Sequence, residues 1–259
     1  MSQRHNKNIR HTHRIFVPTP LGEGATIATS AEQSHYLQNV LRMKSGDELR
    51  LFNGADGEYL GLAERFEKKS VHITLSKQLR AQQEEPKLYL YCAPIKKNHF
   101  DYMVEKATEL GVCAITPVIT QRTQIREVNT ERMQSICIEA AEQSERLNVP
   151  RACPPVTIAE LIKNFPDDRA LIVCAETGEA EHILHALDSE HAQSFDKAAI
   201  LTGPEGGFAE EELEALKKHP NAIFVRLGAR ILRADTAAIA ALSCWQAHSG
   251  DWYSQASIK

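Results

Sequence analysis

From residue 88 onwards, short apolar runs typical of buried strands alternate with longer segments of helical periodicity. The strand-like runs span 88–93, 114–119, 170–175, 198–202 and 223–227. The helical segments span 99–110, 130–146, 179–187, 210–219 and 234–248. Because neighbouring parallel strands need long crossover connections, this alternation predicts an α/β domain with a mainly parallel sheet.

The residues before this region follow a different pattern. Short runs of alternating polarity at 14–17, 25–28, 48–52, 58–62 and 70–75 predict strands, with one short helix at 35–41. The sequence Asn-Gly-Ala-Asp-Gly at 53–57 favours a hairpin turn. We therefore expect a flexible basic arm over 1–13, a small β-barrel over 14–80 and the α/β domain over 81–259, because the polar, proline-ending segment 78–86 reads as a linker.

Charge and cysteine content narrow the class of protein. The formal net charge of −4 does not suit a general RNA binder, so any RNA surface must be local. Residues 1–14 carry Arg4, Lys7, Arg10 and Arg14 without an acid, which is either a phosphate-binding arm or a solvated tail. Six scattered cysteines favour reduced thiols over disulfides or a metal site. Without a long apolar segment or a signal peptide, we expect a cytoplasmic protein with no membrane partner.

Two strand-to-helix loops are candidate ligand sites. The run 198–202 leads into Gly203-Pro204-Glu205-Gly206-Gly207, and acids at 210–212 begin a helix. Ligands of open α/β sheets bind at such strand ends, and glycines permit close approach. Neither a Walker loop nor Gly-x-Gly-x-x-Gly is present, which argues against a nucleotide phosphate cradle. By itself, the loop is equally consistent with an ordinary turn.

The second loop follows the run 223–227 and contains Gly228 and the apolar residues Ile231 and Leu232, flanked by Arg230 and Arg233. Its apolar character fits packing against an adenine ring or burial beneath a neighbouring subunit. Upstream, the sequence 139–146 brings polar side chains to one helix face, and so does the sequence 105–111; both also fit a solvated surface.

Together, these segments resemble the RsmE family of 16S ribosomal RNA uridine-N3 methyltransferases, within the SPOUT superfamily of knotted methyltransferases. The resemblance covers nearly the whole chain. It is carried by Arg-Ile-Phe-Val at 14–17, His35 with Val-Leu-Arg at 40–42, Glu-Lys-Ala-Thr-Glu-Leu-Gly at 105–111, Glu-Ala-Ala-Glu-Gln-Ser-Glu-Arg at 139–146, Gly-Pro-Glu-Gly-Gly-Phe at 203–208 and Leu-Gly-Ala-Arg-Ile-Leu-Arg at 227–233.

The resemblance implies an N-terminal PUA-like RNA-binding barrel and a C-terminal SPOUT domain with a deep trefoil knot, although chains generally avoid knots. It further implies S-adenosylmethionine as cofactor, a homodimer, and 16S ribosomal RNA within the small ribosomal subunit as substrate. The expected cofactor-binding residues are Thr202, Gly203, Pro204, Glu205, Gly206, Gly207, Leu227, Gly228, Ile231, Leu232 and Arg233. The expected RNA-binding residues are Arg10, Arg14, Arg42, Arg122, Arg126 and Arg146.

For catalysis we expect two arginines to orient the target base: Arg233, and Arg14 brought in from the barrel domain of the same or the partner subunit. Methylation at N3 needs loss of a proton and stabilisation of charge on the flanking carbonyl oxygens. Glu139 is the favoured candidate for the general base, which the sequence does not assign. The chain departs from the expected Glu-Thr-Ala after the last arginine, because it has Asp235 there, after Ala234. The shorter carboxylate still suits a helix start, and it reaches one methylene less far than the expected glutamate.

Three alternatives remain open at this point. The chain could be a SPOUT methyltransferase acting on another RNA position, such as a ribose 2′-oxygen or a guanine nitrogen. It could be a noncatalytic RNA-binding factor in ribosome assembly, or a pseudouridine synthase that uses Asp235 as nucleophile. We expect no metal in any of them.

Overall fold

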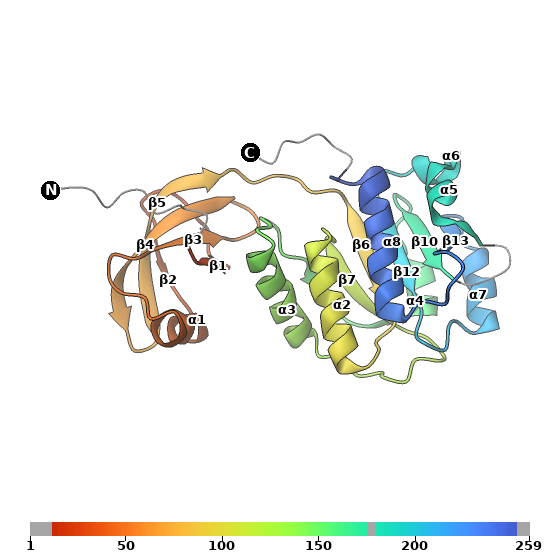
Figure 1. The fold of residues 1–259 in the computed structure, drawn as a ribbon, viewed down its shortest axis with the longest axis horizontal. Helices are drawn as coiled ribbons and strands as arrows, with labels where there is room; N and C mark the ends of the chain where they lie inside the picture. Colours follow the sequence, from red (N-terminus) through yellow and green to blue (C-terminus); the bar gives the residue numbers. More distant parts are fainter. Residues whose placement is uncertain (1–11, 176–179, 253–259) are drawn as a thin grey trace. The chain divides into compact units, whose positions relative to one another are not determined.

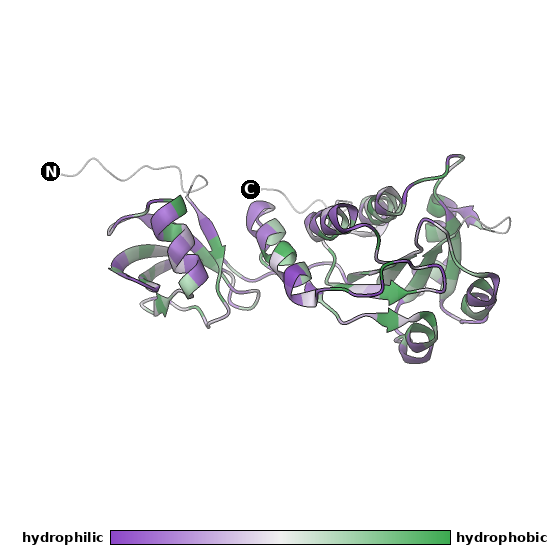
Figure 2. Ribbon diagram, turned by 90° about the horizontal axis from the view of Figure 1, so that it is seen from below, coloured by the Kyte–Doolittle hydropathy of each residue, from purple (hydrophilic) through white to green (hydrophobic). Residues whose placement is uncertain are grey.

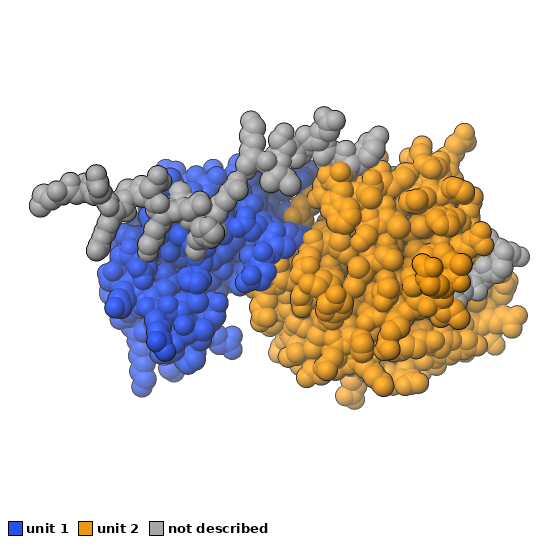
Figure 3. Space-filling model, in the orientation of Figure 1, with its two compact units in different colours: residues 1–84, 141–149 blue, residues 85–140, 150–259 orange. Residues whose placement is uncertain are grey.

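A computed structural model describes residues 12–175 and 180–252 of the chain. The chain folds as two compact units, drawn in different colours in Figure 3. Unit 1 comprises residues 1–84 together with 141–149, and unit 2 comprises residues 85–140 and 150–259. The segment 141–149 therefore belongs to the N-terminal unit, although the chain reaches it only after building part of the second.

Unit 1 is built on a five-stranded sheet in the order β1-β3-β4-β5-β2 (Figure 1). Its strands are β1 (Arg14–Phe16), β2 (Thr26–Ala28), β3 (Glu48–Phe52), β4 (Glu58–Glu67) and β5 (Ser70–Arg80). The pairing is antiparallel except between β1 and β3. Alternate residues of these strands, such as Leu49, Leu51 and Ile73, fill a core that is closed to solvent.

One short helix packs against this sheet, and it begins earlier than the sequence pattern predicts. Helix α1 (Ala31–His35) starts after Ser30, whose hydroxyl accepts a hydrogen bond from the amide of Gln33, while the Gln33 side chain accepts one from Ser30. This reciprocal cap fixes the start. A π-helical turn, η2 (Tyr36–Val40), follows directly.

A buried ion-pair network holds the segment 141–149 in unit 1. Glu58 on β4 accepts hydrogen bonds from Arg14 and Arg80, and Arg50 lies 3.8 Å from its second oxygen. Arg14 also donates to the carbonyl oxygens of Ala141 and Arg146. The guanidinium of Arg14 thus joins the first strand to the end of helix α3 (Thr130–Gln143).

Unit 2 contains a parallel sheet whose main path runs β11-β13-β10-β12-β6-β7-β8. The strands are β6 (Leu88–Cys92), β7 (Ala114–Ile119), β8 (Arg151–Ala152), β9 (Val156–Thr157), β10 (Ala170–Cys174), β11 (Glu181–His182), β12 (Ala198–Thr202) and β13 (Ala222–Arg226). The other helices are α2 (Lys97–Glu109), α4 (Ile158–Asn164), α5 (Ile183–Asp188), α6 (Glu190–Gln193), α7 (Glu210–Lys217) and α8 (Ala234–Ser249).

Helices cover both faces of this sheet, as Figures 1 and 2 show from two directions. Helices α2 and α8 pack together on one face, whereas α4 and α7 lie on the other. The strands between them are almost entirely apolar, as expected for parallel strands buried on both faces. The expected α/β class with a mainly parallel sheet is confirmed for this unit.

The sequence pattern did not indicate all of these elements. Helix α4 was not predicted, although Thr157 caps it and Glu160 reciprocates. The segment 179–187, predicted as one helix, instead holds strand β11 before helix α5 within the described residues. Short helices and strands bury too few residues to produce a clear periodicity of apolar residues in the sequence.

Candidate active site

The carboxyl ends of β10, β12 and β13 meet at one edge of the sheet and surround a cavity of about 410 Å³. Strand β10 lies between the other two in space, although β12 and β13 follow it in sequence. Such a reversal of strand order opens a crevice at the sheet edge. The lining includes Cys174, Ala175, residues 202–208, residues 225–227, residues 230–232, Leu213, Arg122 and the first turn of α8.

The glycine-rich loop after β12 forms one wall of the cavity. Gly207 has a φ of 67°, a conformation that favours glycine, and its amide donates to the carbonyl of Pro204 to close a tight turn. Arg122 reaches this loop from after β7 and donates to the carbonyl of Gly206 at 2.9 Å. Arg122 was predicted to bind RNA, and the structure places it against the cavity.

Glu212, in the first turn of α7, ties this loop to the segment after β7. Its two carboxylate oxygens accept hydrogen bonds from the backbone amides of Gln121 and Ala209, at 2.9 and 2.8 Å. The side chain is buried. One carboxylate therefore satisfies an amide at the start of α7 and fixes the position of the Arg122 loop.

Thr202, the last residue of β12, lines the cavity and carries a buried hydroxyl. The residue is 2% exposed. Within the described part of the chain, its Oγ1 atom is one of four buried side-chain polar atoms without a hydrogen-bond partner. A buried hydroxyl normally has a partner, so this atom fits a ligand that supplies one.

The loop between β13 and α8 forms another wall. Gly228, between the cavity-lining residues Leu227 and Arg230, has a φ of 116°, which a residue with a side chain rarely adopts. Ile231 is 86% exposed although it also lines the cavity, and Leu232 is partly buried. The loop thus offers an apolar surface both to a ligand and to solvent.

Beside this loop, the first turns of α2 and α8 bring three polar side chains into contact. The Nδ1 atom of His99 lies 2.8 Å from Oδ2 of Asp235, and the Nε2 atom lies 3.5 Å from Nη2 of Arg233. Burial alone would raise the pKa of Asp235, but hydrogen bonds from His99 and the Thr236 amide, with the Arg233 charge, hold it below its usual value. The carboxylate is therefore ionised at neutral pH.

Arg14 and Glu139, the other residues predicted for catalysis, are not among the residues that line this cavity. Arg14 is 8% exposed within the Glu58 network of unit 1, and its guanidinium stacks on the ring of Phe52. These buried hydrogen bonds give Arg14 a structural role in unit 1, and its catalytic role stays a prediction. Glu139 lies on α3, is exposed, and is not among the residues that line the cavity.

The remaining arginines predicted to bind RNA differ in exposure. Arg42 and Arg126 are exposed, and Arg42 has a φ of 54°. Arg146 is 8% exposed, which does not suit a direct phosphate contact. Arg10 lies outside the described residues.

The described residues of this site support neither a cysteine nucleophile nor a metal centre. Burial raises the pKa of the Cys174 thiol to about 12, so this cavity-lining cysteine is not a nucleophile at neutral pH. The described residues contain no cluster of three His, Cys, Asp or Glu side chains that could hold a metal ion.

None of the helices in the described part of the chain is both long enough and apolar enough to cross a bilayer.

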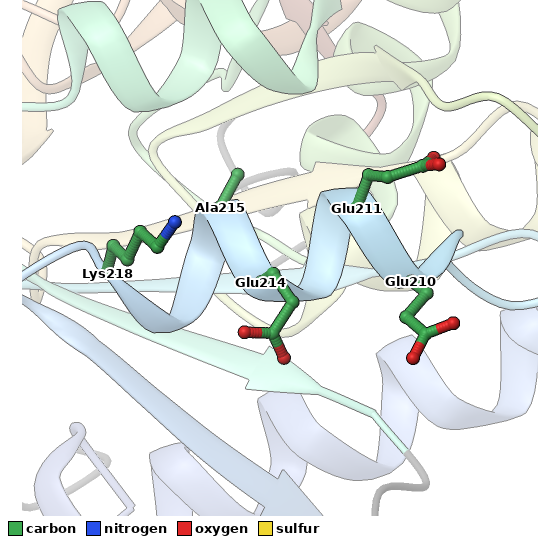
Figure 4. Close-up of a pocket in the computed structure, with 5 residues that line it drawn as sticks. All are labelled: Glu210, Glu211, Glu214, Ala215 and Lys218. Carbon is green, nitrogen blue, oxygen red and sulfur yellow. The ribbon is translucent and has the colours of Figure 1, made fainter.

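A second, open hollow lies along helix α7 (Figure 4). Its lining residues are Glu210, Glu211, Glu214, Ala215 and Lys218. Three carboxylates and a single ammonium group would repel a phosphate backbone, so this hollow does not suit an RNA strand.

Sequence reasoning did not identify His99 or Glu212 as site residues. Glu212 stands three residues after Ala209, the spacing of a side chain that returns to the start of its own helix, and that signal was available. His99 carries no such signal, because its contact with Asp235 joins residues that are 136 positions apart.

Comparison with known proteins agrees with this architecture. Residues 83–246 match the model of the RNA methyltransferase domain, and residues 29–76 match the RNA methyltransferase PUA domain. Among solved structures, a methyltransferase of Legionella pneumophila with bound SAM has a TM-score of 0.84 at 32% identity, covering 93% of this chain and 99% of its own. A ribosomal RNA small subunit methyltransferase E of Neisseria gonorrhoeae bound to S-adenosyl methionine has a TM-score of 0.83 at 29% identity, covering 93% and 100%.

Relatives from other bacteria carry the same name as the Neisseria gonorrhoeae protein. The ribosomal RNA small subunit methyltransferase E of Rickettsia conorii is 37% identical over 89% of this chain and 93% of its own length. That of Synechocystis is 32% identical over 85% and 72%, respectively. The family model covers more than half of the chain, with the PUA domain before it. The chain therefore belongs to the ribosomal RNA small subunit methyltransferase E family of RNA methyltransferases.

Proposed function

We propose that this protein transfers a methyl group from S-adenosylmethionine to N3 of a uridine in 16S ribosomal RNA. The observation that carries the proposal is the cavity at the ends of β10, β12 and β13, together with the family membership. The names of the relatives support a small-subunit ribosomal RNA substrate. The N3 position rests on the sequence resemblance.

The residues around the cavity fit S-adenosylmethionine. The unpartnered Oγ1 of Thr202 can hydrogen-bond a polar ligand group, and Leu227, Ile231 and Leu232 offer apolar contact to a flat ring. The glycines at 203, 206 and 207 let a ligand approach the backbone. When bound, the cofactor supplies a methyl group that its sulfonium already activates.

Arg233 is the residue we assign to the target base. It is exposed at the start of α8, next to the cavity-lining residues Leu232 and Ala234. Loss of the N3 proton leaves negative charge on the two flanking carbonyl oxygens, and a guanidinium stabilises such charge. The target uridine must be unpaired or flipped out, because its Watson–Crick edge reacts.

Replacement of Arg233 tests this assignment. Arg233→Ala should lower the rate of methyl transfer by about 100-fold, as expected for loss of a charge-stabilising donor, while the Kd for S-adenosylmethionine changes by less than about threefold. Single-turnover kinetics and titration calorimetry measure the two quantities. A variant with unchanged transfer rate would remove Arg233 from the proposal.

We also propose how the protein assembles and contacts its RNA. We infer a homodimer with the exposed loop 228–233 near the subunit interface, a trefoil knot in the C-terminal domain, RNA contacts from the barrel, Arg42 and Arg126, and action in the cytoplasm. The 86% exposure of Ile231 supports burial of this loop by a second subunit.

The decisive experiment is methyl transfer to small ribosomal subunits that lack the modification, followed by nucleoside analysis of digested RNA. We expect N3-methyluridine. A 2′-O-methylated nucleoside or a methylated guanine would show the alternative SPOUT activity, and failure to bind S-adenosylmethionine in calorimetry would show a noncatalytic assembly factor. Naked 16S RNA as a second substrate tests the need for the assembled subunit.

A further inference from the structure

We propose that His99, held by Asp235, is the general base that removes the N3 proton of the target uridine. The inference rests on the proposed function and assigns the role for which Glu139 was the earlier candidate. It starts from the contact of His99 with both Asp235 and Arg233 at the meeting point of α2 and α8.

The contact with Asp235 fixes the proton on the ring. An ionised carboxylate has no proton to donate, so Nδ1 of a neutral His99 carries the hydrogen and donates to Oδ2 of Asp235. The Nε2 atom then holds a lone pair. This is the arrangement in which a buried carboxylate orients an imidazole that acts as a base through its other nitrogen.

Exposure separates the two partners in the way this role requires. The side chain of Asp235 is 11% exposed and that of His99 is 43% exposed. Asp235 is therefore held in the protein, while His99 is open to an incoming base. The contact of Nε2 with Arg233 is long, at 3.5 Å, and a substrate N–H can replace it without leaving either group buried and unpaired.

The position of His99 relative to the cavity follows from the residues around the start of α8. Arg233 and Asp235 alternate with Leu232 and Ala234, which line the cavity, and Ala237 lines it one turn later. The first turn of α8 therefore presents one side to the cavity and another to His99. A uracil that contacts Arg233 through a carbonyl oxygen would bring its N3–H towards Nε2, because the two groups are adjacent on the ring.

The proton balance of the step is complete. The N3–H bond breaks and its proton passes to Nε2, while the nitrogen electron pair forms the new bond to the methyl carbon. The electron pair of the breaking carbon–sulfur bond stays on sulfur. The resulting imidazolium is stabilised by Asp235 and later loses its proton to water.

Charged groups near His99 are few in the described structure. Asp235 comes from α8 and Arg233 from the loop before it. Lys96 immediately precedes α2 and Lys97 is its first residue, while Asp101 on α2 is ion-paired with Arg132 of α3. The opposite charges of Asp235 and Arg233 contact opposite nitrogens of the imidazole.

A pH series distinguishes a base from a structural residue. Single-turnover methyl transfer to unmodified small subunits is measured from pH 6 to 9 with saturating S-adenosylmethionine for wild type, His99→Ala and His99→Gln. At pH 7 both variants should be slower by about 100-fold or more, the usual contribution of a general base. Their rates should rise about tenfold per pH unit as hydroxide replaces the base, whereas the wild-type rate levels off.

Three further measurements complement the pH series. Added imidazole should restore transfer by His99→Ala, because it can occupy the space of the lost ring. Nitrogen-15 NMR of the histidine rings should show the Nδ1–H form for His99 in wild type and lose that signature in Asp235→Asn. Calorimetry should give an unchanged Kd for S-adenosylmethionine in every variant.

The control is His185→Ala, because His185 is exposed on α5 and does not line the cavity. It should match wild type throughout. A His99 variant that keeps the wild-type rate, or that slows with an unchanged pH profile and no imidazole rescue, overturns the base assignment. If wild type transfers no methyl group to N3, the proposed function fails instead, and the NMR result still decides whether the Asp235–His99 pair exists.

Discussion

At the scale of single residues, Thr202 shows how a buried atom without a partner points to a ligand. Its hydroxyl sits at the end of a strand whose other residues are apolar and closed to solvent. Leaving such a group unpaired costs about 1 to 3 kcal/mol in a folded protein. The free protein carries this cost, and a bound ligand that hydrogen-bonds the hydroxyl removes it.

This reasoning predicts effects of opposite sign for Thr202→Val. The variant should bind S-adenosylmethionine about 2- to 10-fold more weakly, the value of one hydrogen bond, and should unfold at the same or a higher temperature. Calorimetry and thermal unfolding measure the two effects. Thr202→Ser keeps the hydroxyl and should retain the affinity. If valine leaves affinity unchanged, the hydroxyl does not contact the ligand.

The sequence was informative about the residues of the cavity and less so about those around it. Gly203, Gly207, Leu227 and Ile231 were predicted from two loops, and all of them line the cavity or its approach. Arg14 belonged to a recognised motif, yet its side chain is buried in unit 1. Membership of a motif does not distinguish a residue that stabilises the fold from one that takes part in the reaction.

At the scale of elements, the loops of the site depend on contacts that no local pattern contains. The parallel strands were predictable because each is a continuous apolar run. The order of those strands was not, since β10 lies between β12 and β13 through pairings between distant residues. The contact of Glu212 with Gln121 likewise joins helix α7 to a loop 91 residues earlier in the chain.

Glu212 therefore allows a test of how the loops are held. Glu212→Ala removes two hydrogen bonds to backbone amides, one of them at the start of α7, and should cost about 1 to 2 kcal/mol of stability. Loss of the link to the Arg122 loop should also weaken binding of S-adenosylmethionine. Chemical denaturation and calorimetry measure both.

The matched control lies two residues further along the same helix. Glu214 is exposed and pairs with Lys217, so Glu214→Ala should change stability by less than about 0.5 kcal/mol and leave affinity unchanged. Equal effects of the two substitutions would mean that loss of helix charge, rather than loss of the loop contacts, is responsible.

At the scale of the whole molecule, the N-terminal unit is discontinuous in sequence. Residues 141–149 complete a unit that otherwise ends at residue 84. Sequence reasoning placed a single linker at 78–86 because composition changes there, and composition carries no information about a later return of the chain. Hydrogen bonds from Arg14 to the carbonyl oxygens of Ala141 and Arg146 hold the returning segment in unit 1.

The carboxylate of Glu58 holds this arrangement together, and Glu58→Gln tests it. Although burial alone would raise the pKa of Glu58, hydrogen bonds from Arg80 and Arg14 keep it below its usual value. The glutamine variant leaves the buried charge of Arg14 without its partner and should lose about 3 to 5 kcal/mol at pH 7. The control, Glu64→Gln on the exposed end of β4, should lose less than about 1 kcal/mol.

The pH dependence of unfolding gives the sign of the Glu58 contribution. A carboxyl group with a lowered folded pKa stabilises the protein fully above its unfolded pKa, about 4.3, and this stabilisation is lost as the pH falls through the folded value. Wild type should therefore lose more stability than Glu58→Gln between pH 5 and the acid limit of folding, by urea denaturation. Parallel acid profiles would mean that the arginines are held by the backbone carbonyls alone, and that the discontinuous unit does not depend on the ion pair.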